Sequence, residues 1–102
     1  MAESVINLPT SQKRGSGNIV EGITWHRRGN VVMLLISATI TDTVNRTLLG
    51  TMPPDLYPPI AMFSSGFASG VVSYGLVDTD GKIYGYRSTA GNLLVSVVWG
   101  VI

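Results

Sequence analysis

The sequence contains no cysteine and a single histidine, and only 13% of its residues are charged, against about 25% in an average soluble protein. Without cysteine the chain has neither disulfide bonds nor thiolate metal ligands, on which small extracellular domains often depend. Seven Lys and Arg against six Asp and Glu give a net charge of +1. This balance excludes a strongly basic protein that binds nucleic acid by displacing counterions.

Catalytic groups are equally scarce. One histidine and six scattered carboxylates provide no pairing of a nucleophile with a base and no evident pair of acids for glycoside hydrolysis, so we expect no enzyme and no cofactor. Residues 78–81 (DTDG) resemble part of a calcium-binding loop, but Arg87 stands where that loop needs a bidentate glutamate. The sequence therefore predicts no metal site.

Long hydrophobic runs are absent too. The chain has no run of about 18 apolar residues, and residues 1–10 lack the charged and apolar regions of a secretory signal. We therefore expect neither insertion into a membrane nor export by the general secretory route.

Apolar residues, in contrast, are abundant for a chain of 102 residues: they make up 45%, with a mean hydropathy of +0.33. A domain of this size buries only about 60–65% of its unfolded surface. Some apolar surface is therefore left over unless another subunit covers it. The composition predicts an oligomer.

Twelve glycines and five prolines lie among β-branched runs, and no segment has helical periodicity, which predicts an all-β domain. Residues 11–18 (SQKRGSGN) are polar and rich in Gly and Ser, as linkers are. We therefore expect an extended neck over residues 1–16 and a single head domain over residues 17–102.

A first hairpin is predicted from residues 19–28 and 31–41, which flank the turn dipeptide Gly29-Asn30. In this register Trp25 lies opposite Leu34, and His26 lies opposite Met33 on the other face. Residues 31–36 are apolar on both faces, which is typical of a strand covered on two sides. We expect a neighbouring subunit to provide the second cover.

The middle and the end of the chain give further expectations. Residues 42–59 lack a clear strand pattern and end in MPPDLYPP, which favours an extended, polyproline-like crossover between sheets. Residues 61–68 predict a short strand, and the apolar residues 93–102 predict a last strand inside a sheet.

A second hairpin joins residues 71–77 to 82–87 through the turn 78–81. Its register places Tyr74 opposite Tyr86 on one face and Gly75 opposite Gly85 on the other. Opposed glycines predict a strip of bare backbone that another strand, ring or subunit can approach.

Two interpretations of the tyrosine pair follow. The rings form a stacking platform for a sugar, with hydrogen-bonding groups supplied by Arg87, Asp78 and Asp80. Alternatively, Tyr74 and Tyr86 only pack on each other within the sheet, and the two aspartates only cap the turn.

The order of these features resembles the C-terminal head domains of receptor-binding proteins on the baseplates of lactococcal-type siphophages, and more broadly the trimeric fibre heads of tailed phages. The resemblance runs from residues 6–10 (INLPT) and 28–32 (RGNVV), through 52–58 (MPPDLYP), to the hairpin around Gly81. It implies a compact antiparallel β-barrel or sandwich with Greek-key-like connections that assembles as a homotrimer.

The resemblance also implies a function: attachment of the virion to its host by binding a cell-wall saccharide. In that family a histidine and a tryptophan face each other where Tyr74 and Tyr86 stand here. Leu76 replaces the family's acid, and Leu94 or a neighbour replaces its arginine. The implied partners are two further copies of the chain, the saccharide and the rest of the phage baseplate or fibre. The alternative is a structural trimerisation or baseplate accessory domain that binds no glycan.

Overall fold

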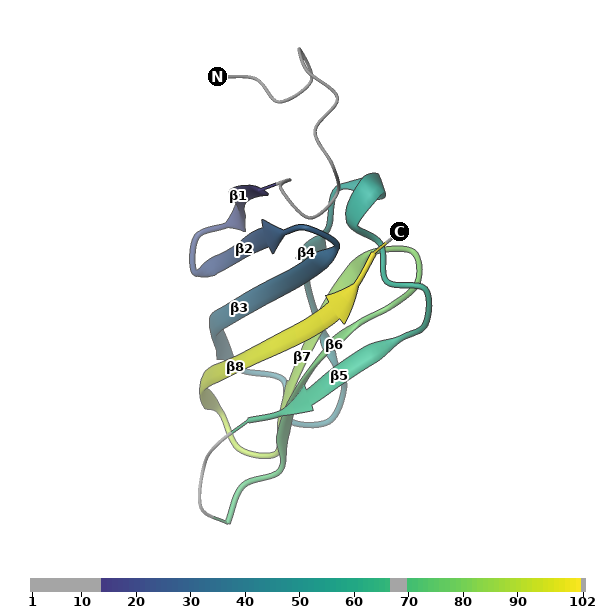
Figure 1. The fold of residues 1–102 in the computed structure, drawn as a ribbon. Helices are drawn as coiled ribbons and strands as arrows, with labels where there is room; N and C mark the ends of the chain where they lie inside the picture. The colour runs from purple at the N-terminus through teal and green to yellow at the C-terminus, as the bar shows by residue number, and fades with distance from the viewer. Residues whose placement is uncertain (1–13, 67–69, 102) are drawn as a thin grey trace.

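The computed structural model describes residues 14–66 and 70–101. These residues form eight β-strands and one turn of 3-10 helix (Figure 1). The elements are β1 (Arg14–Val20), β2 (Ile23–Arg28), β3 (Val31–Ile40), β4 (Thr47–Thr51), η3 (Pro54–Leu56), β5 (Met62–Ser65), β6 (Ser73–Val77), β7 (Lys82–Arg87) and β8 (Gly91–Gly100). The predicted all-β class is confirmed. No helix of the described residues is long and apolar enough to cross a membrane.

The strands form two antiparallel sheets of four strands each, in the orders β1-β2-β3-β8 and β4-β7-β6-β5, called sheet A and sheet B below. The chain builds three strands of sheet A, crosses to build all of sheet B, and returns so that β8 pairs with β3. Figure 1 shows β5 of sheet B running beside β8, the edge strand of sheet A, and residues of the two strands are in contact. The two sheets thus pack as layers around one core.

The first hairpin has the predicted register, with Trp25 opposite Leu34 and His26 opposite Met33. In its two-residue turn, Gly29 alone takes a positive φ of 63°, the pattern of a type II′ turn. The predicted strand over residues 19–28 is wrong in one respect: it is broken at Gly22, whose φ is 83°. This second turn lets β1 fold back onto β2.

Strand β1 occupies most of what the composition indicated as a linker. Residues 14–18 pair with β2, so the linker prediction is wrong for that part. Residues 1–13, which hold the rest of the predicted neck, lie outside the described residues. Glycine is favoured in this strand because the indole of Trp25 lies directly over its backbone: a Cβ on Gly17 would stand 2.8 Å from Trp25 Nε1.

The crossover after β3 differs from the expected irregular, extended segment. It contains strand β4, and η3 interrupts the extended backbone between Pro53 (φ −57°, ψ 144°) and Tyr57 (φ −63°, ψ 134°). The η3 turn buries the side chain of Leu56, and the Leu56 carbonyl accepts a 2.9 Å hydrogen bond from Trp99 Nε1. The proline-rich segment therefore covers one part of the core and provides the hydrogen-bond acceptor for the buried indole N–H of Trp99.

The second hairpin also has the predicted register, Tyr74 opposite Tyr86 and Gly75 opposite Gly85. The expected strip of bare backbone, however, is not open. Both glycines face the core, where a Cβ on Gly75 would stand 2.8 Å from Val95 Cγ1 of the other sheet. The absence of side chains is what lets the two sheets approach each other.

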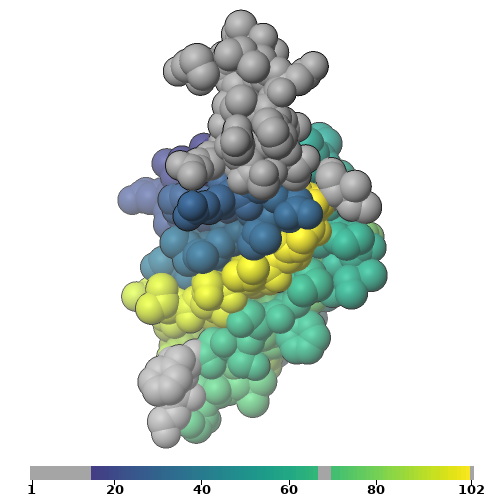
Figure 2. Space-filling view, in the orientation of Figure 1, coloured from purple at the N-terminus to yellow at the C-terminus, as the bar shows by residue number. Residues whose placement is uncertain are grey.

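The outward side of sheet A carries an apolar face made by β3 and β8. Within the described chain β3 is covered on one side only: Val32, Leu34 and Ile36 are buried, while the alternate residues are between 39% and 49% exposed. The apolar face of sheet A consists of Val31, Met33, Leu35, Leu94 and Val98. Figure 2 shows β3 in blue and β8 in yellow side by side on this surface. Coverage by a neighbouring subunit stays a prediction.

Candidate functional site

The outward side of sheet B is rich in aromatic residues, and we call it the aromatic face. It follows from strand alternation: Tyr74 and Leu76 on β6 point away from the core, and so do Tyr84 and Tyr86 on β7. Phe63 on β5 lies opposite Leu76 and is 70% exposed. These five side chains, Phe63, Tyr74, Leu76, Tyr84 and Tyr86, define the aromatic face.

Tyr74 and Tyr86 form a stacked cross-strand pair on this face. Their ring centroids are 5.3 Å apart and the ring planes are inclined by 29°. The hydroxyl of Tyr86 donates a 3.1 Å hydrogen bond to the carbonyl of Thr43. Both rings are half-buried, so they stabilise the sheet and also present ring surface to solvent.

The loop between β3 and β4 lies against the aromatic face and is ordered by Asp42. One carboxylate oxygen of Asp42 accepts hydrogen bonds from the backbone N–H groups of Val44 (2.9 Å) and Asn45 (3.0 Å). The loop places the Thr43 carbonyl at the Tyr86 hydroxyl and the guanidinium of Arg46 over the ring of Tyr84, 4.6 Å from its centroid. Loop 42–46 is thus part of the site.

The hydrogen bonds that Asp42 accepts give a titration prediction. The backbone N–H of Asn45, followed by that of Val44, holds the pKa of Asp42 below its ordinary value of 3.8. A folded-state pKa below the unfolded value stabilises the loop above the unfolded pKa, and this stabilisation is lost as the pH falls through the folded pKa. In a carbon-detected NMR titration we expect the Asp42 carboxyl to titrate below pH 3.8 and the amide protons of Val44 and Asn45 to shift with the same midpoint. A midpoint at or above 3.8 would contradict this role.

A shallow cavity of about 350 Å³ opens on the aromatic face. Its lining combines apolar and hydrogen-bonding groups: Arg46, Phe63, Ser65, Val72, Ser73, Tyr74 and Leu76. Ring surface beside a few polar groups is typical of sites for small polar ligands. A hollow of about 570 Å³ lies on the opposite sheet beside Leu35 and Leu94, but it is lined mainly by aliphatic and small residues.

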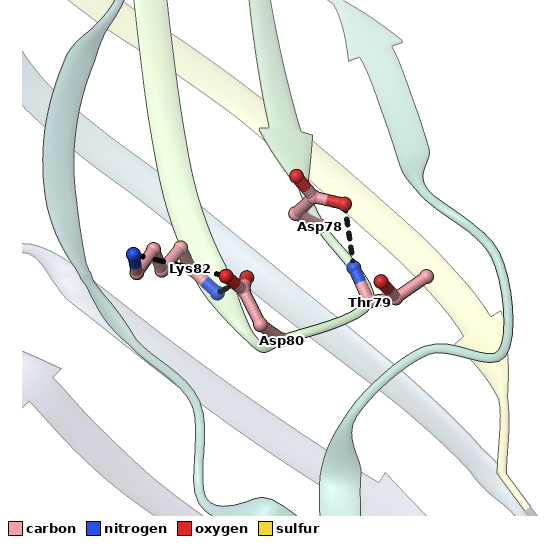
Figure 3. A network of polar contacts seen from close by, with 4 residues as sticks. All are labelled: Asp78, Thr79, Asp80 and Lys82. Carbon is pink, nitrogen blue, oxygen red and sulfur yellow. Dashed lines mark hydrogen bonds and ion pairs between the residues drawn. The ribbon is translucent and has the colours of Figure 1, made fainter.

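Asp78 and Asp80 lie at the closed end of the second hairpin (Figure 3). Asp78 accepts a 2.8 Å hydrogen bond from the N–H of Thr79, and Asp80 accepts one of 3.1 Å from the N–H of Lys82. The Lys82 ammonium stands 3.8 Å from Asp80. Both aspartates therefore order the turn. They are also remote from the tyrosine pair, because a strand rises about 3.3 Å per residue and Asp78 is therefore about 13 Å along the strand from Tyr74.

Arg87 lies apart from the tyrosine pair because it directly follows Tyr86 on β7, and successive side chains of a strand point to opposite faces of the sheet. Its guanidinium donates hydrogen bonds to the carbonyl of Asn92 (3.1 Å) and to the carbonyl and hydroxyl of Thr89 (3.4 Å each), which holds the turn between β7 and β8. Of the five predicted site residues, Tyr74 and Tyr86 lie together on the aromatic face, whereas Asp78 and Asp80 share the turn at the end of the hairpin and Arg87 lies apart from both pairs.

Two members of the site, Arg46 and Phe63, were missed by sequence reasoning. Arg46 reaches Tyr84 because β4 pairs with β7, and neither that strand nor its pairing is evident from local pattern. Phe63 lies on a predicted strand, and its outward direction follows only once the pairing of β5 with β6 is known.

Among the residues that the structure describes, no three His, Asp or Glu side chains cluster closely enough to hold a metal ion.

Comparisons with protein-family models, curated proteins and solved structures find no significant match to this chain.

Proposed function

We propose that this chain is the head domain of a phage receptor-binding protein, which attaches the virion to its host by binding a cell-wall saccharide on the aromatic face. The observation that carries the proposal is the stacked pair of Tyr74 and Tyr86 beside a cavity with hydrogen-bonding walls. The apolar CH face of a sugar ring packs on exposed aromatic rings, while polar neighbours orient its hydroxyls. The all-β fold and the resemblance in sequence order support the same assignment.

The proposed working form is a homotrimer in which each head closes as a β-barrel. The contact between β5 and β8 supports closure, and the uncharged, exposed apolar face of sheet A supports burial against other copies. Three weak saccharide sites on one trimer raise the overall affinity because binding at one site holds the others near the cell surface.

Removing the ring of Tyr74 tests the site. We expect the protein to bind purified lactococcal cell-wall polysaccharide saturably, and Tyr74→Ala to weaken binding about tenfold or more, because each lost stacking contact is multiplied over three sites. Surface-immobilised polysaccharide and graded protein concentrations measure this. Tyr74→Phe keeps the ring and serves as the matched control with near-normal binding. Equal binding by all three proteins, or no saturable binding by the wild type, would refute the proposed site.

The second candidate is a structural trimerisation or baseplate accessory domain that binds no glycan. The apolar face of sheet A favours it, because assembly alone explains those residues. This candidate predicts a stable oligomer together with the absence of saccharide binding in the same assay, so the two functions are separated by one experiment.

A further inference from the structure

Arg46 occupies a distinctive position on the aromatic face. Its guanidinium stands 4.6 Å from the centroid of Tyr84, and the same side chain lines the cavity that Phe63 and Tyr74 also line. A guanidinium over an aromatic ring is attracted by the negative face of the ring. Arg46 thus contacts the ring of Tyr84 and lines the cavity with the same side chain.

The charge of Arg46 is not neutralised within the described residues. There the carboxylate of Asp80 lies near Lys82, and the guanidinium groups of Arg27 and Arg87 donate to backbone carbonyls. No carboxylate of residues 14–66 and 70–101 lies within ion-pair distance of Arg46, and no protein acceptor there bonds to its guanidinium. Asp42, in the same loop, uses its carboxylate to accept two backbone N–H groups.

We propose that Arg46 makes the aromatic face selective for acidic saccharides, those that carry a carboxylate or a phosphate group. This inference rests on the proposed function and specifies the ligand class of the same site. The sugar ring packs on Tyr74 and Tyr86, and its acidic substituent accepts hydrogen bonds from the Arg46 guanidinium at the cavity wall.

The chemistry of arginine supports this selectivity. A guanidinium presents N–H donors in a fixed fork that matches the two oxygens of a carboxylate or phosphate. Its contact with Tyr84 restricts the side chain before the ligand arrives, which lowers the ordering cost of binding. A neutral sugar offers only hydroxyls to the same group and forms weaker hydrogen bonds with it.

The test compares three sugars of matched ring structure on the 15N-labelled full chain: glucose, glucuronate and glucose 6-phosphate. We expect NMR titrations to show about tenfold tighter binding for the two acidic sugars than for glucose, since hydrogen bonds to charged groups are about twice as strong as neutral ones. Arg46→Gln should bring the ratio below about twofold while glucose binding is retained. Lys82→Gln is the matched control, because Lys82 is a cation at the far end of β7 that lies near Asp80 and does not line the cavity, and it should leave the ratio unchanged.

The outcomes separate this inference from the proposed function. An acidic preference that persists in Arg46→Gln, or equal binding of all three sugars by the wild type, overturns the role of Arg46 and leaves saccharide binding intact. Loss of glucose binding in a folded Arg46→Gln protein also overturns it, because the arginine would then serve the platform as a whole. If none of the sugars shifts the signals of Tyr74 and Tyr86, both proposals fall. Tighter binding of only one acidic sugar identifies carboxylate or phosphate as the recognised group.

Discussion

Replacing Gly75 with alanine is expected to lower the free energy of unfolding by about 1–3 kcal/mol, the range for overpacking a filled core. A Cβ at this position would stand 2.8 Å from Val95 Cγ1 and 2.9 Å from Ile36 Cδ1. Both neighbours belong to sheet A, and Ile36 is fully buried, so neither has free space to retreat into. The added methyl group would force the two sheets apart or push core side chains out of their preferred rotamers.

Urea unfolding followed by tryptophan fluorescence measures this loss, with all proteins at one concentration because an oligomer gains stability by mass action. Gly85→Ala should behave similarly, since its Cβ would stand 2.7 Å from Leu93 Cδ2. Gly100→Ala is the matched control: it lies at the end of β8, and the nearest atom to its Cβ is the Asn30 carbonyl oxygen at 3.7 Å. A Gly75→Ala protein as stable as Gly100→Ala would show that the sheets do not approach closely at this point.

Gly75 and Gly85 show which features of the fold can be predicted from the sequence and which cannot. The pairing of Gly75 with Gly85 was predictable because the turn at 78–81 fixes the register: the N–H of Asp78 donates to Lys82, and Gly81 takes the required positive φ of 82°. Which layer fills the space beside the glycines was not predictable. That depends on sheet A, whose strands come from both ends of the chain.

Strand β1 was missed for a related reason. Its sequence, RGSGNIV, has almost no apolar side chains from which alternation can be recognised. Its glycines instead accommodate the Trp25 indole, which approaches the position of a Cβ on Gly15 to 3.4 Å. A long-range or cross-strand partner decides the structure of such a segment, and local composition alone resembles that of a linker.

The candidate site likewise contains residues whose proximity the sequence predicts and residues whose proximity it does not. Tyr74 and Tyr86 were predictable as neighbours because both belong to one hairpin with a recognisable turn. Arg46 comes to Tyr84 through the pairing of β4 with β7, although the two residues are 38 positions apart (84 − 46) and the proline-rich crossover lies between them. The residue that gives the proposed site its charge was therefore the one for which the sequence held no local signal.

The apolar face of sheet A leads to the second large effect. Met33 lies near the middle of this face, directly opposite His26 on one side and Val98 on the other. In a single chain Met33 is 41% exposed, and Leu35 and Val98 beside it are 39% and 48% exposed. Adjacent outward positions on β3 and β8 carry no charged side chain, a composition typical of the centre of an interface between subunits.

We therefore expect Met33→Glu to dissociate the proposed trimer and weaken its association at least about a hundredfold, because removing a carboxylate from water between subunits costs several kcal/mol even with His26 opposite it. Sedimentation velocity at micromolar concentration should show the wild type at about three times 10.9 kDa and the variant at the mass of one chain. Ile60→Glu is the control, since Ile60 is 65% exposed but lies outside sheet A. Because Met33 points away from the core, the monomer should keep its fold and its single-site affinity for saccharide while losing the gain from three linked sites. A wild type that sediments as one chain, or a Met33→Glu protein that remains trimeric, would place the subunit contact elsewhere.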